Sequence, residues 1–321
     1  MRLSFSTKGW HGASWQDFLE TASDLGFQGI EIHNLRAPAM TKKGGPADAN
    51  AAAAAYRALY DRKLVVPCVN VTNDLCDAAR FGELMEEIKE CVEAARRLHA
   101  PFVRLHTVRE GANYDEALVR KALAEALPLA ETNEAVLLIE TVGAYADTAR
   151  LRALLDDYAS DSLAALWNFH FPWRLHGESA QTSVTNLGAY IRHVHIRDSA
   201  LEGEKLSFQL IGEGELPVDS LMRALDSVDY DGFVSLEWDP AWMEELDDMT
   251  VIFAHFAGFM SRYGAAEEQK SLYPNKPHTG WRVWPKETLI HQTFSQVLDR
   301  MVEEFPDQYA VKYTTLDYTR T

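Results

Sequence analysis

The chain has 321 residues, of which 47% are hydrophobic and 25% charged, so it can bury a full core and has the size of one α/β barrel. Asp and Glu total 48 against 31 for Lys and Arg, and the net charge of −17 disfavours nucleic acid or an anionic membrane surface as partner. A small neutral or metal-bound substrate suits this charge better.

Cysteine usage and the first residues bear on the cellular compartment. The three cysteines, Cys68, Cys76 and Cys91, show no C-x-x-C spacing, and no basic segment followed by an apolar stretch opens the chain. We therefore expect a protein of the reducing cytoplasm with no transmembrane segment.

Short apolar runs alternate with amphipathic stretches from residue 1 to about residue 264, which is typical of repeated βα units on a parallel sheet. We count eight pairs. The expected strands cover residues 3–6, 29–33, 65–71, 102–106, 135–139, 163–167, a run ending near 195, and 233–236. The expected helices include one opening at Ser14, the alanine run 51–55, and residues 81–99, 114–131, 147–158 and 243–263, with a further helix starting near Pro217 after a glycine-containing turn.

Eight βα units in about 264 residues match a (β/α)₈ TIM barrel in count and length. The predicted fold class is therefore α/β, with a TIM barrel over residues 1–264 and a short C-terminal α/β extension over residues 265–321. In such a barrel the chemistry lies where the strands end.

Polar side chains end the last four predicted strands: Glu140, Asn168, His195 and Glu237. A lone histidine is more often a hydrogen-bonded core residue than a ligand, but four such groups are costly to bury unless they satisfy one another or a cation. Two carboxylates, an imidazole and an amide oxygen suit one divalent ion such as Mn²⁺, Mg²⁺, Co²⁺ or Zn²⁺. We predict a metal site here.

Further polar residues lie at or near strand ends and are candidates for substrate binding. A polyol or keto sugar needs several hydrogen-bonding groups around it. The candidates are His33, His106, His170 and Arg197.

Three segments resemble the xylose-isomerase-like barrel family: VLLIET around Glu140, YIRHVHIRDS around His195, and LIGEGELP followed by YDGFVSLEW around Glu237. The family includes sugar phosphate isomerases and epimerases, inosose dehydratase, 3-dehydroshikimate dehydratase and, more distantly, endonuclease IV. The resemblance implies that four strand-end ligands hold one divalent metal and that Glu140 and Glu237 exchange a substrate proton as acid and base. It thus implies a metal-dependent isomerase or epimerase of a sugar or sugar-like keto compound.

The sixth strand departs from the family pattern, because Asn168 stands where relatives usually place aspartate and Phe171 where many place histidine. Asparagine can coordinate a hard cation but brings no charge, so metal affinity should fall. Two alternatives therefore stay open. One is a dehydratase of a cyclic polyol or of 3-dehydroshikimate, and the other is a weakened barrel that serves as a binding or scaffold module.

The pattern changes after residue 264, where a polar linker leads into a segment rich in proline and aromatic residues. The run TFSQVLDRMVEEFPDQYAVKYTTLDYTRT resembles the opening of an acyl-adenylate-forming (AMP-dependent) ligase, which implies a fused ligase domain beyond residue 321. Alternatively, residues 272–321 form an arm that packs on the barrel, as in homo-oligomeric members of the barrel family.

Overall fold

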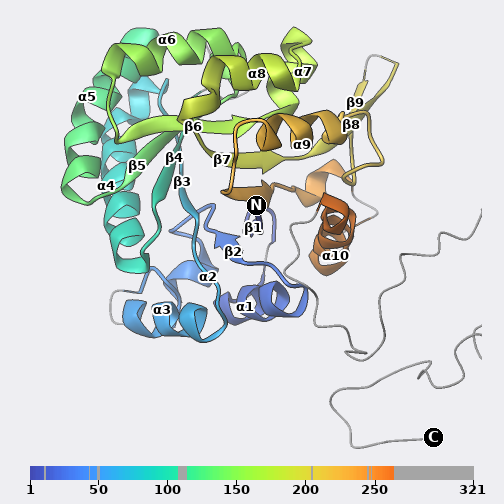
Figure 1. Cartoon of the computed structure of the whole chain (residues 1–321). Helices are drawn as coiled ribbons and strands as arrows, with labels where there is room; N and C mark the ends of the chain where they lie inside the picture. Colours follow the sequence, from blue (N-terminus) through green and yellow to red (C-terminus); the bar gives the residue numbers. More distant parts are fainter. Residues whose placement is uncertain are drawn as a thin grey trace, which may run out of the picture. The chain divides into compact units, whose positions relative to one another are not determined.

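Eight parallel strands form one sheet that curls into a nearly closed barrel (Figure 1). The computed structural model describes residues 1–263 apart from 11, 43, 49–50, 108–113, 204, 244–245 and 247. The barrel strands are β1 (Arg2–Ser6), β2 (Gly29–Glu31), β3 (Cys68–Asp74), β4 (Phe102–His106), β5 (Val136–Glu140), β6 (Leu163–Asn168), β7 (Ile191–Ile196) and β10 (Phe233–Leu236).

The strands lie in the order β2-β1-β10-β7-β6-β5-β4-β3. The ends of this sheet meet through the isolated bridges Gly29↔Val65 and Ile32↔Val69, which bring β2 to the start of β3. The predicted TIM barrel is therefore confirmed. Among the described residues, none of the helices is long and apolar enough to cross a bilayer.

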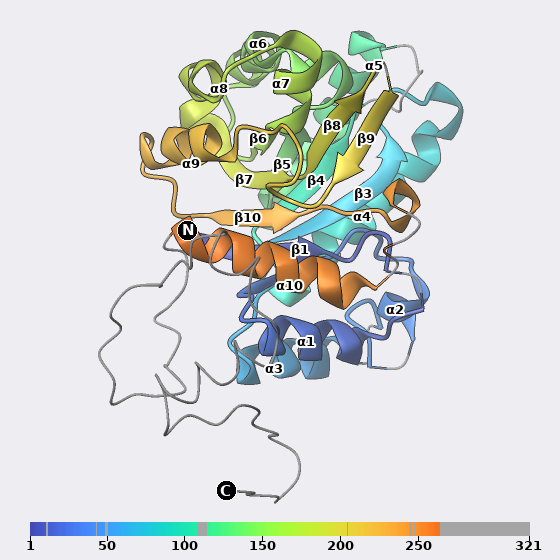
Figure 2. The ribbon, with the colours of Figure 1, turned by 90° about the vertical axis from the view of Figure 1, so that its right-hand side faces the viewer.

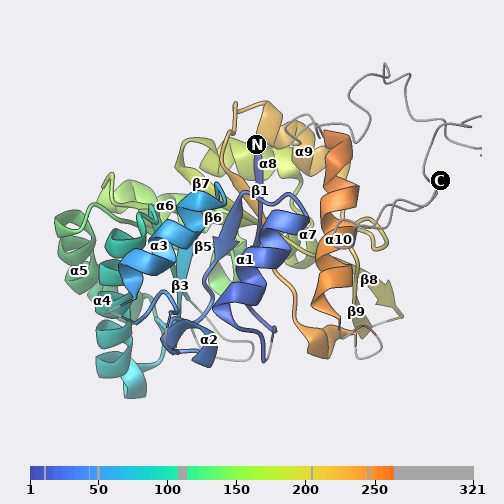
Figure 3. The same cartoon turned by 90° about the horizontal axis from the view of Figure 1, so that it is seen from below.

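Helices surround the strands in chain order, and α10 lies beside α1 where the ring comes together (Figure 2; Figure 3). Ser14, where the sequence predicts that a helix opens, caps α1 through a capping box with Asp17. The α-helices are α1 (Trp15–Asp24), α2 (Pro38–Thr41), α3 (Ala52–Asp61), α4 (Phe81–Leu98), α5 (Glu116–Thr132), α6 (Thr148–Tyr158), α7 (His170–His176), α8 (Ala180–Leu187), α9 (Val218–Asp226) and α10 (Met249–Met260); the short 3₁₀ helices are η1 (Ala78–Arg80), η2 (Gly143–Ala146), η3 (Gly188–Tyr190), η4 (Pro240–Trp242) and η5 (Ser261–Tyr263).

Two predicted element starts and the segment after β7 differ from the structure. The third strand begins at Cys68 and runs to Asp74, because the Val65 region forms only the bridge to β2. The last helix begins at Met249, after the N-cap Asp248, six residues later than predicted. The stretch after β7 contains an antiparallel hairpin of β8 (Asp198–Glu202) and β9 (Lys205–Gln209), which the sequence analysis did not anticipate and which stands apart from the barrel sheet (Figure 3).

Side chains alternate between the two faces of each strand, and this alternation separates two cores. Outward residues such as Val103, Ile139 and Trp167 belong to the large cluster beneath the helices. Inward residues Cys68, Leu138, Ala164 and Leu166 form a small apolar cluster inside the barrel, toward the amino ends of the strands. The next inward positions toward the carboxyl ends are polar.

The chain divides into the units Met1–Glu267 and Glu268–Thr321. The described residues belong to the first unit. The ligase-like run and the predicted extension lie outside the described residues, so the boundary near residue 264 and the fused ligase stay predictions.

Candidate active site

The four polar residues predicted at the strand ends lie together at the carboxyl end of the barrel. Nδ1 of His195 is 3.3 Å from Oε1 of Glu140 and 4.0 Å from Oε2 of Glu237. The side-chain Nδ2 of Asn168 donates to Oε1 of Glu140 at 2.8 Å, and Asn168 pairs in register with His195 across β6 and β7. All four side chains are buried.

Three cationic side chains surround the two glutamates, and only one of them, Arg197, is among the residues predicted from the sequence. Arg104 lies on β4, and its Nε and Nη2 contact Oε2 of Glu140 at 2.9 and 2.8 Å. Nη2 of Arg197 lies 2.6 Å from Oε2 of Glu237, and Nζ of Lys8 lies 3.0 Å from Oε1 of the same carboxylate. The two strand-end carboxylates are therefore already paired with fixed positive charges.

A second carboxylate–histidine group lies one layer deeper, and the sequence analysis missed it. Glu31, at the end of β2, accepts from Nε2 of His195 with both oxygens, at 2.8 and 2.9 Å, and contacts Nε2 of His193 at 2.7 Å. Asn70 donates to Oε1 of Glu31 at 2.6 Å. Because Nε2 of His195 faces Glu31, its Nδ1 faces Glu140 and Glu237.

Strand alternation is the signal that would have found these residues. In β4, Arg104 shares the inward face with His106, and in the run after Gly29, Glu31 shares it with His33. The two residues of each pair are two positions apart in the sequence. A candidate side chain that faces into the barrel at a strand end therefore predicts that the residue two positions earlier faces into the barrel as well.

Neighbouring charges keep Glu140, Glu237 and His195 ionised, although burial opposes the ionisation of all three. Burial opposes ionisation of Glu140, but Arg104 and His195 hold its pKa well below the usual range. Burial also opposes ionisation of Glu237. The charges of Arg197, Lys8 and His195 nevertheless hold the pKa of Glu237 far below normal. Burial would lower the pKa of His195, yet Glu31 and Glu140 raise it to about 9. Both glutamates are thus carboxylates at neutral pH.

The remaining predicted site residues occupy different surroundings. His33 and His106 are half-buried, and each has a buried Nδ1 without a hydrogen-bond partner among the described residues. Burial and the charge of Arg104 lower the pKa of each to about 4. His170 instead bonds through Nε2 to Oγ of Ser199 at 2.8 Å and contacts none of the four strand-end residues by hydrogen bond.

Asp198 follows this cluster and organises the loop that leads to α9. Its two carboxylate oxygens accept from the backbone N–H groups of Ser199, Gly212, Gly214 and Leu216 at 2.7 to 3.1 Å. A Cβ at Gly214 would lie 2.2 Å from Oδ1 of Asp198, so only glycine permits this approach. The glycine-containing segment is a turn into α9, as the sequence predicts.

The donor set fits a divalent ion in type and spacing. One donor atom from each of Glu140, His195 and Glu237 lies within 4.8 Å of the other two, and ligand distances of about 2.0 to 2.6 Å allow such separations. Oδ1 of Asn168 is buried and has no hydrogen-bond partner among the described residues, so a fourth donor atom is free to coordinate. An ion that joins Glu140 and Glu237 would require Nη2 of Arg197 to withdraw, because it lies 2.6 Å from Glu237 and 4.0 Å from Glu140.

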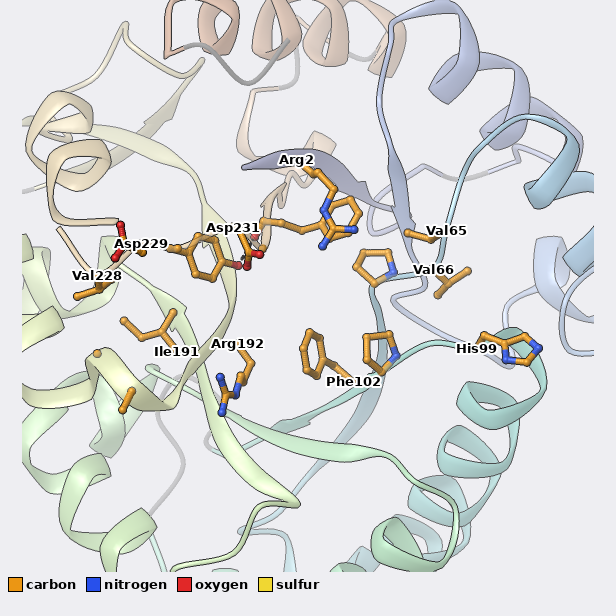
Figure 4. Close-up of a pocket in the computed structure, with 17 residues that line it drawn as sticks. Arg2, Val65, Val66, His99, Phe102, Ile191, Arg192, Val228, Asp229 and Asp231 are labelled. Carbon is orange, nitrogen blue, oxygen red and sulfur yellow. Dashed lines mark hydrogen bonds between the residues drawn. The ribbon is translucent and has the colours of Figure 1, made fainter. Parts of the chain in front are cut away.

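A separate pocket of about 490 Å³ lies at the opposite, amino ends of the strands (Figure 4). Its lining includes Arg2, Phe102 and Arg192, which stand at the starts of β1, β4 and β7. None of the predicted site residues lines it. In TIM barrels the amino end serves stability rather than chemistry, so the candidate active site is the polar cluster at the carboxyl ends.

Residues 19–251 match the model of the xylose isomerase-like TIM barrel family. The chain belongs to this family. The chain is similar to a fructoselysine 3-epimerase of Shigella flexneri, with 26% identity over 245 residues that cover 70% of this chain and 85% of that protein. This relative agrees with the predicted isomerase or epimerase class.

Solved structures share the barrel. The crystal structure of a probable 3-DHS dehydratase involved in petrobactin synthesis from Bacillus anthracis has a TM-score of 0.67 and 17% identity, covering 81% of this chain and 99% of that one. The IOLI protein, solved with a bound zinc atom, has a TM-score of 0.66 and 16% identity, covering 82% and 99%. At these identities the likeness concerns the fold.

Proposed function

We propose that this family member is a divalent-metal-dependent isomerase or epimerase that acts on a sugar or a sugar-like keto compound. The observation that carries the proposal is the pair Glu140 and Glu237, two buried carboxylates joined through His195 at 3.3 and 4.0 Å. The similarity to a named epimerase over most of the barrel supports the same class of reaction.

In the proposed reaction one glutamate accepts the proton from the carbon beside the substrate carbonyl. The electron pair of that C–H bond forms a carbon–carbon double bond, and the π electrons of the carbonyl move to its oxygen. Because both glutamates are ionised at neutral pH, the other glutamate first takes up a proton from solvent and then gives it to the opposite face of the same carbon in an epimerisation. In an isomerisation the proton goes to the neighbouring carbon, and the hydroxyl proton of the first carbon moves to solvent as that hydroxyl becomes the new carbonyl. The first glutamate finally releases its proton to solvent. A divalent ion held by Glu140, Asn168, His195 and Glu237 would supply Lewis-acid stabilisation of the negative oxygen. The buried charge of Arg104 lies beside Glu140 and favours the same negative oxygen.

The test uses Glu237→Gln, which keeps the shape of the side chain and removes its capacity to accept a proton. A panel of ketoses is incubated with protein and Mn²⁺ in deuterated water, and proton NMR measures exchange at the carbon beside the carbonyl. We expect at least a hundredfold loss of exchange, in the range attributed to a positioned general base of about 10² to 10⁴.

Glu90→Gln serves as the matched control, because Glu90 makes an exposed ion pair with Arg36 and should leave exchange unchanged. Full exchange in Glu237→Gln would refute the assigned role. A product lighter by one water would instead identify the dehydratase alternative.

A further inference from the structure

Permanent cations already match the buried carboxylates of this cluster in number. Lys8, Arg104 and Arg197 each lie within 3.0 Å of an oxygen of Glu140 or Glu237, and Glu31 behind His195 is the third carboxylate, so three permanent cations face three carboxylates. A divalent ion at this point would add two more positive charges. Buried charges of one sign are costly unless opposite charges accompany them.

The three cations differ in how firmly the barrel holds them. Arg104 lies inside the barrel, with 5% of its side chain exposed, and contacts both the carboxylate of Glu140 and the carbonyl of Val71. Arg197 and Lys8 contact Glu237 from nearer the mouth, and the side chain of Lys8 is 25% exposed. Lys8 can therefore exchange partners more readily than Arg104 can, whereas Arg197, with 7% of its side chain exposed, is buried almost as deeply as Arg104.

Arg197 also has an unused donor that points to a ligand. The residue is 6% exposed, and its Nε is buried without a hydrogen-bond partner among the described residues. A buried guanidinium donor without a partner is unfavourable, and the Nε and Nη donors of arginine together match the two oxygens of a carboxylate or phosphate.

Aromatic rings from α7 and η4 lie against these two cations, and a third ring supports one of them. The Arg197 guanidinium lies 4.6 Å from the ring centre of Phe171 and 5.3 Å from that of Trp242, and Nζ of Lys8 lies 5.4 Å from the Trp242 ring. Phe208 of the β8–β9 hairpin stacks on Trp242 at 4.1 Å. Phe171, at the position where relatives often carry histidine, thus supports a cation in this chain.

We propose that the substrate carries an anionic group, a carboxylate or a phosphate, and that Arg197 and Lys8 bind this group. On binding, the anion draws both cations away from Glu237, which frees that carboxylate to accept a proton and balances the charge of a metal ion. The inference rests on the proposed function, because it assigns the substrate class of the same site.

The net charge of −17 does not oppose this assignment. Exposed charges are screened over about 8 Å at physiological ionic strength, whereas Arg197 and Lys8 would contact the anion directly in a partly water-excluded site. The neutral substrate predicted from the overall composition is therefore replaced here by an anionic one, on the basis of the local charges.

The test compares three small ketones of similar size: neutral dihydroxyacetone, its carboxylate analogue hydroxypyruvate, and its phosphate ester. Titration calorimetry measures the Kd of each for the full chain with Mn²⁺ present. We expect at least one of the two anions to bind about tenfold or more tightly than dihydroxyacetone, which corresponds to about 1.4 kcal/mol. The stronger of the two identifies the source of the anionic group.

Lys8→Met and Arg197→Lys should each reduce that preference severalfold, since the first removes a charge and the second removes the two-pronged geometry while keeping the charge. Lys205→Met, at the exposed first residue of β9, is the matched control and should keep the preference. Circular dichroism establishes that each variant is folded. Equal affinity of the wild type for all three ketones would overturn the inference.

The same measurements separate this inference from the proposed function. Deuterium exchange on a neutral ketose, without tighter binding of the anionic ketones, would support the proposed isomerase or epimerase and refute the anion site at Arg197 and Lys8. Tight anion binding without deuterium exchange on any ketose or keto acid would support the anion site and refute the proposed isomerase or epimerase activity.

Discussion

Glu31 binds Nε2 of His195 with both carboxylate oxygens, at 2.8 and 2.9 Å, from the opposite side of the imidazole to Glu140. This contact fixes the ring so that Nδ1 faces the two strand-end glutamates. A carboxylate behind a metal-binding histidine orients the ring and increases its basicity. Glu31 therefore acts as a positioning residue for the proposed metal site.

Glu31→Gln should weaken metal binding about 10 to 100-fold, the usual cost of losing such a supporting carboxylate. Isothermal titration of the metal-free protein with Mn²⁺ measures the change. Glu83→Gln, which removes an exposed ion pair with Arg80, should leave the Mn²⁺ affinity as it is. An unchanged affinity in Glu31→Gln would show that the histidine is held without this carboxylate.

The sequence was sufficient for the barrel and for part of the cluster. Polar residues that follow apolar strands identified Glu140, Asn168, His195 and Glu237, and the structure places all four together. Neither Arg104 nor Glu31 was predicted, because strand ends were considered singly, without the positions two residues earlier on the same inward face.

Other features depend on contacts between distant parts of the chain. The pairing of Lys8 with Glu237 spans 229 positions, and no local pattern encodes it. The β8–β9 hairpin follows directly after Arg197 and forms a sheet of its own. Its short strands pair with no barrel strand, so their sequence lacks the long apolar run of a barrel strand and resembles a loop. The carboxylate of Asp198, which joins this hairpin to the turn before α9, became evident only from its contacts.

Asp198→Asn should destabilise the fold while preserving the volume of the side chain. The carboxylate accepts four backbone N–H groups, whereas an asparagine would turn its NH₂ group toward two of them. Hydrogen bonds to charged acceptors contribute about 1.5 to 3 kcal/mol each, so a loss of about 3 kcal/mol in the free energy of unfolding is expected. Urea denaturation at pH 7 measures it.

Asp77→Asn is the matched control for that substitution. Asp77 caps η1 through Ala79 and Arg80, and asparagine caps helices about as well as aspartate, so the change should stay within about 0.5 kcal/mol. A similar loss in both variants would attribute the effect to charge removal in general rather than to the Asp198 contacts.

The stability of the protein should fall as the pH drops below 6.5, and His170 supplies a defined part of that loss. Burial, with Arg197 and Arg174 nearby, lowers the pKa of His170 from 6.5 to about 3. The unfolded chain therefore takes up a proton near pH 6.5 while the folded protein does not. The contribution is fully present above pH 6.5 and is lost progressively as the pH falls toward 3. His33 and His106 act in the same direction, with folded-state pKa values of about 4.

His170→Gln removes this titration and keeps a side chain that can bond to Ser199. Between pH 7 and pH 5, a histidine with such a pKa lowers the free energy of unfolding by about 2 kcal/mol. The free energy of unfolding of His170→Gln should therefore fall by about 2 kcal/mol less than that of the wild type over this interval. Urea denaturation at both pH values gives the difference. His176→Gln, at an exposed histidine of the same helix, should follow the wild type. If His170→Gln lost as much stability as the wild type between these pH values, protonation of His170 would not contribute to the acid sensitivity of the barrel.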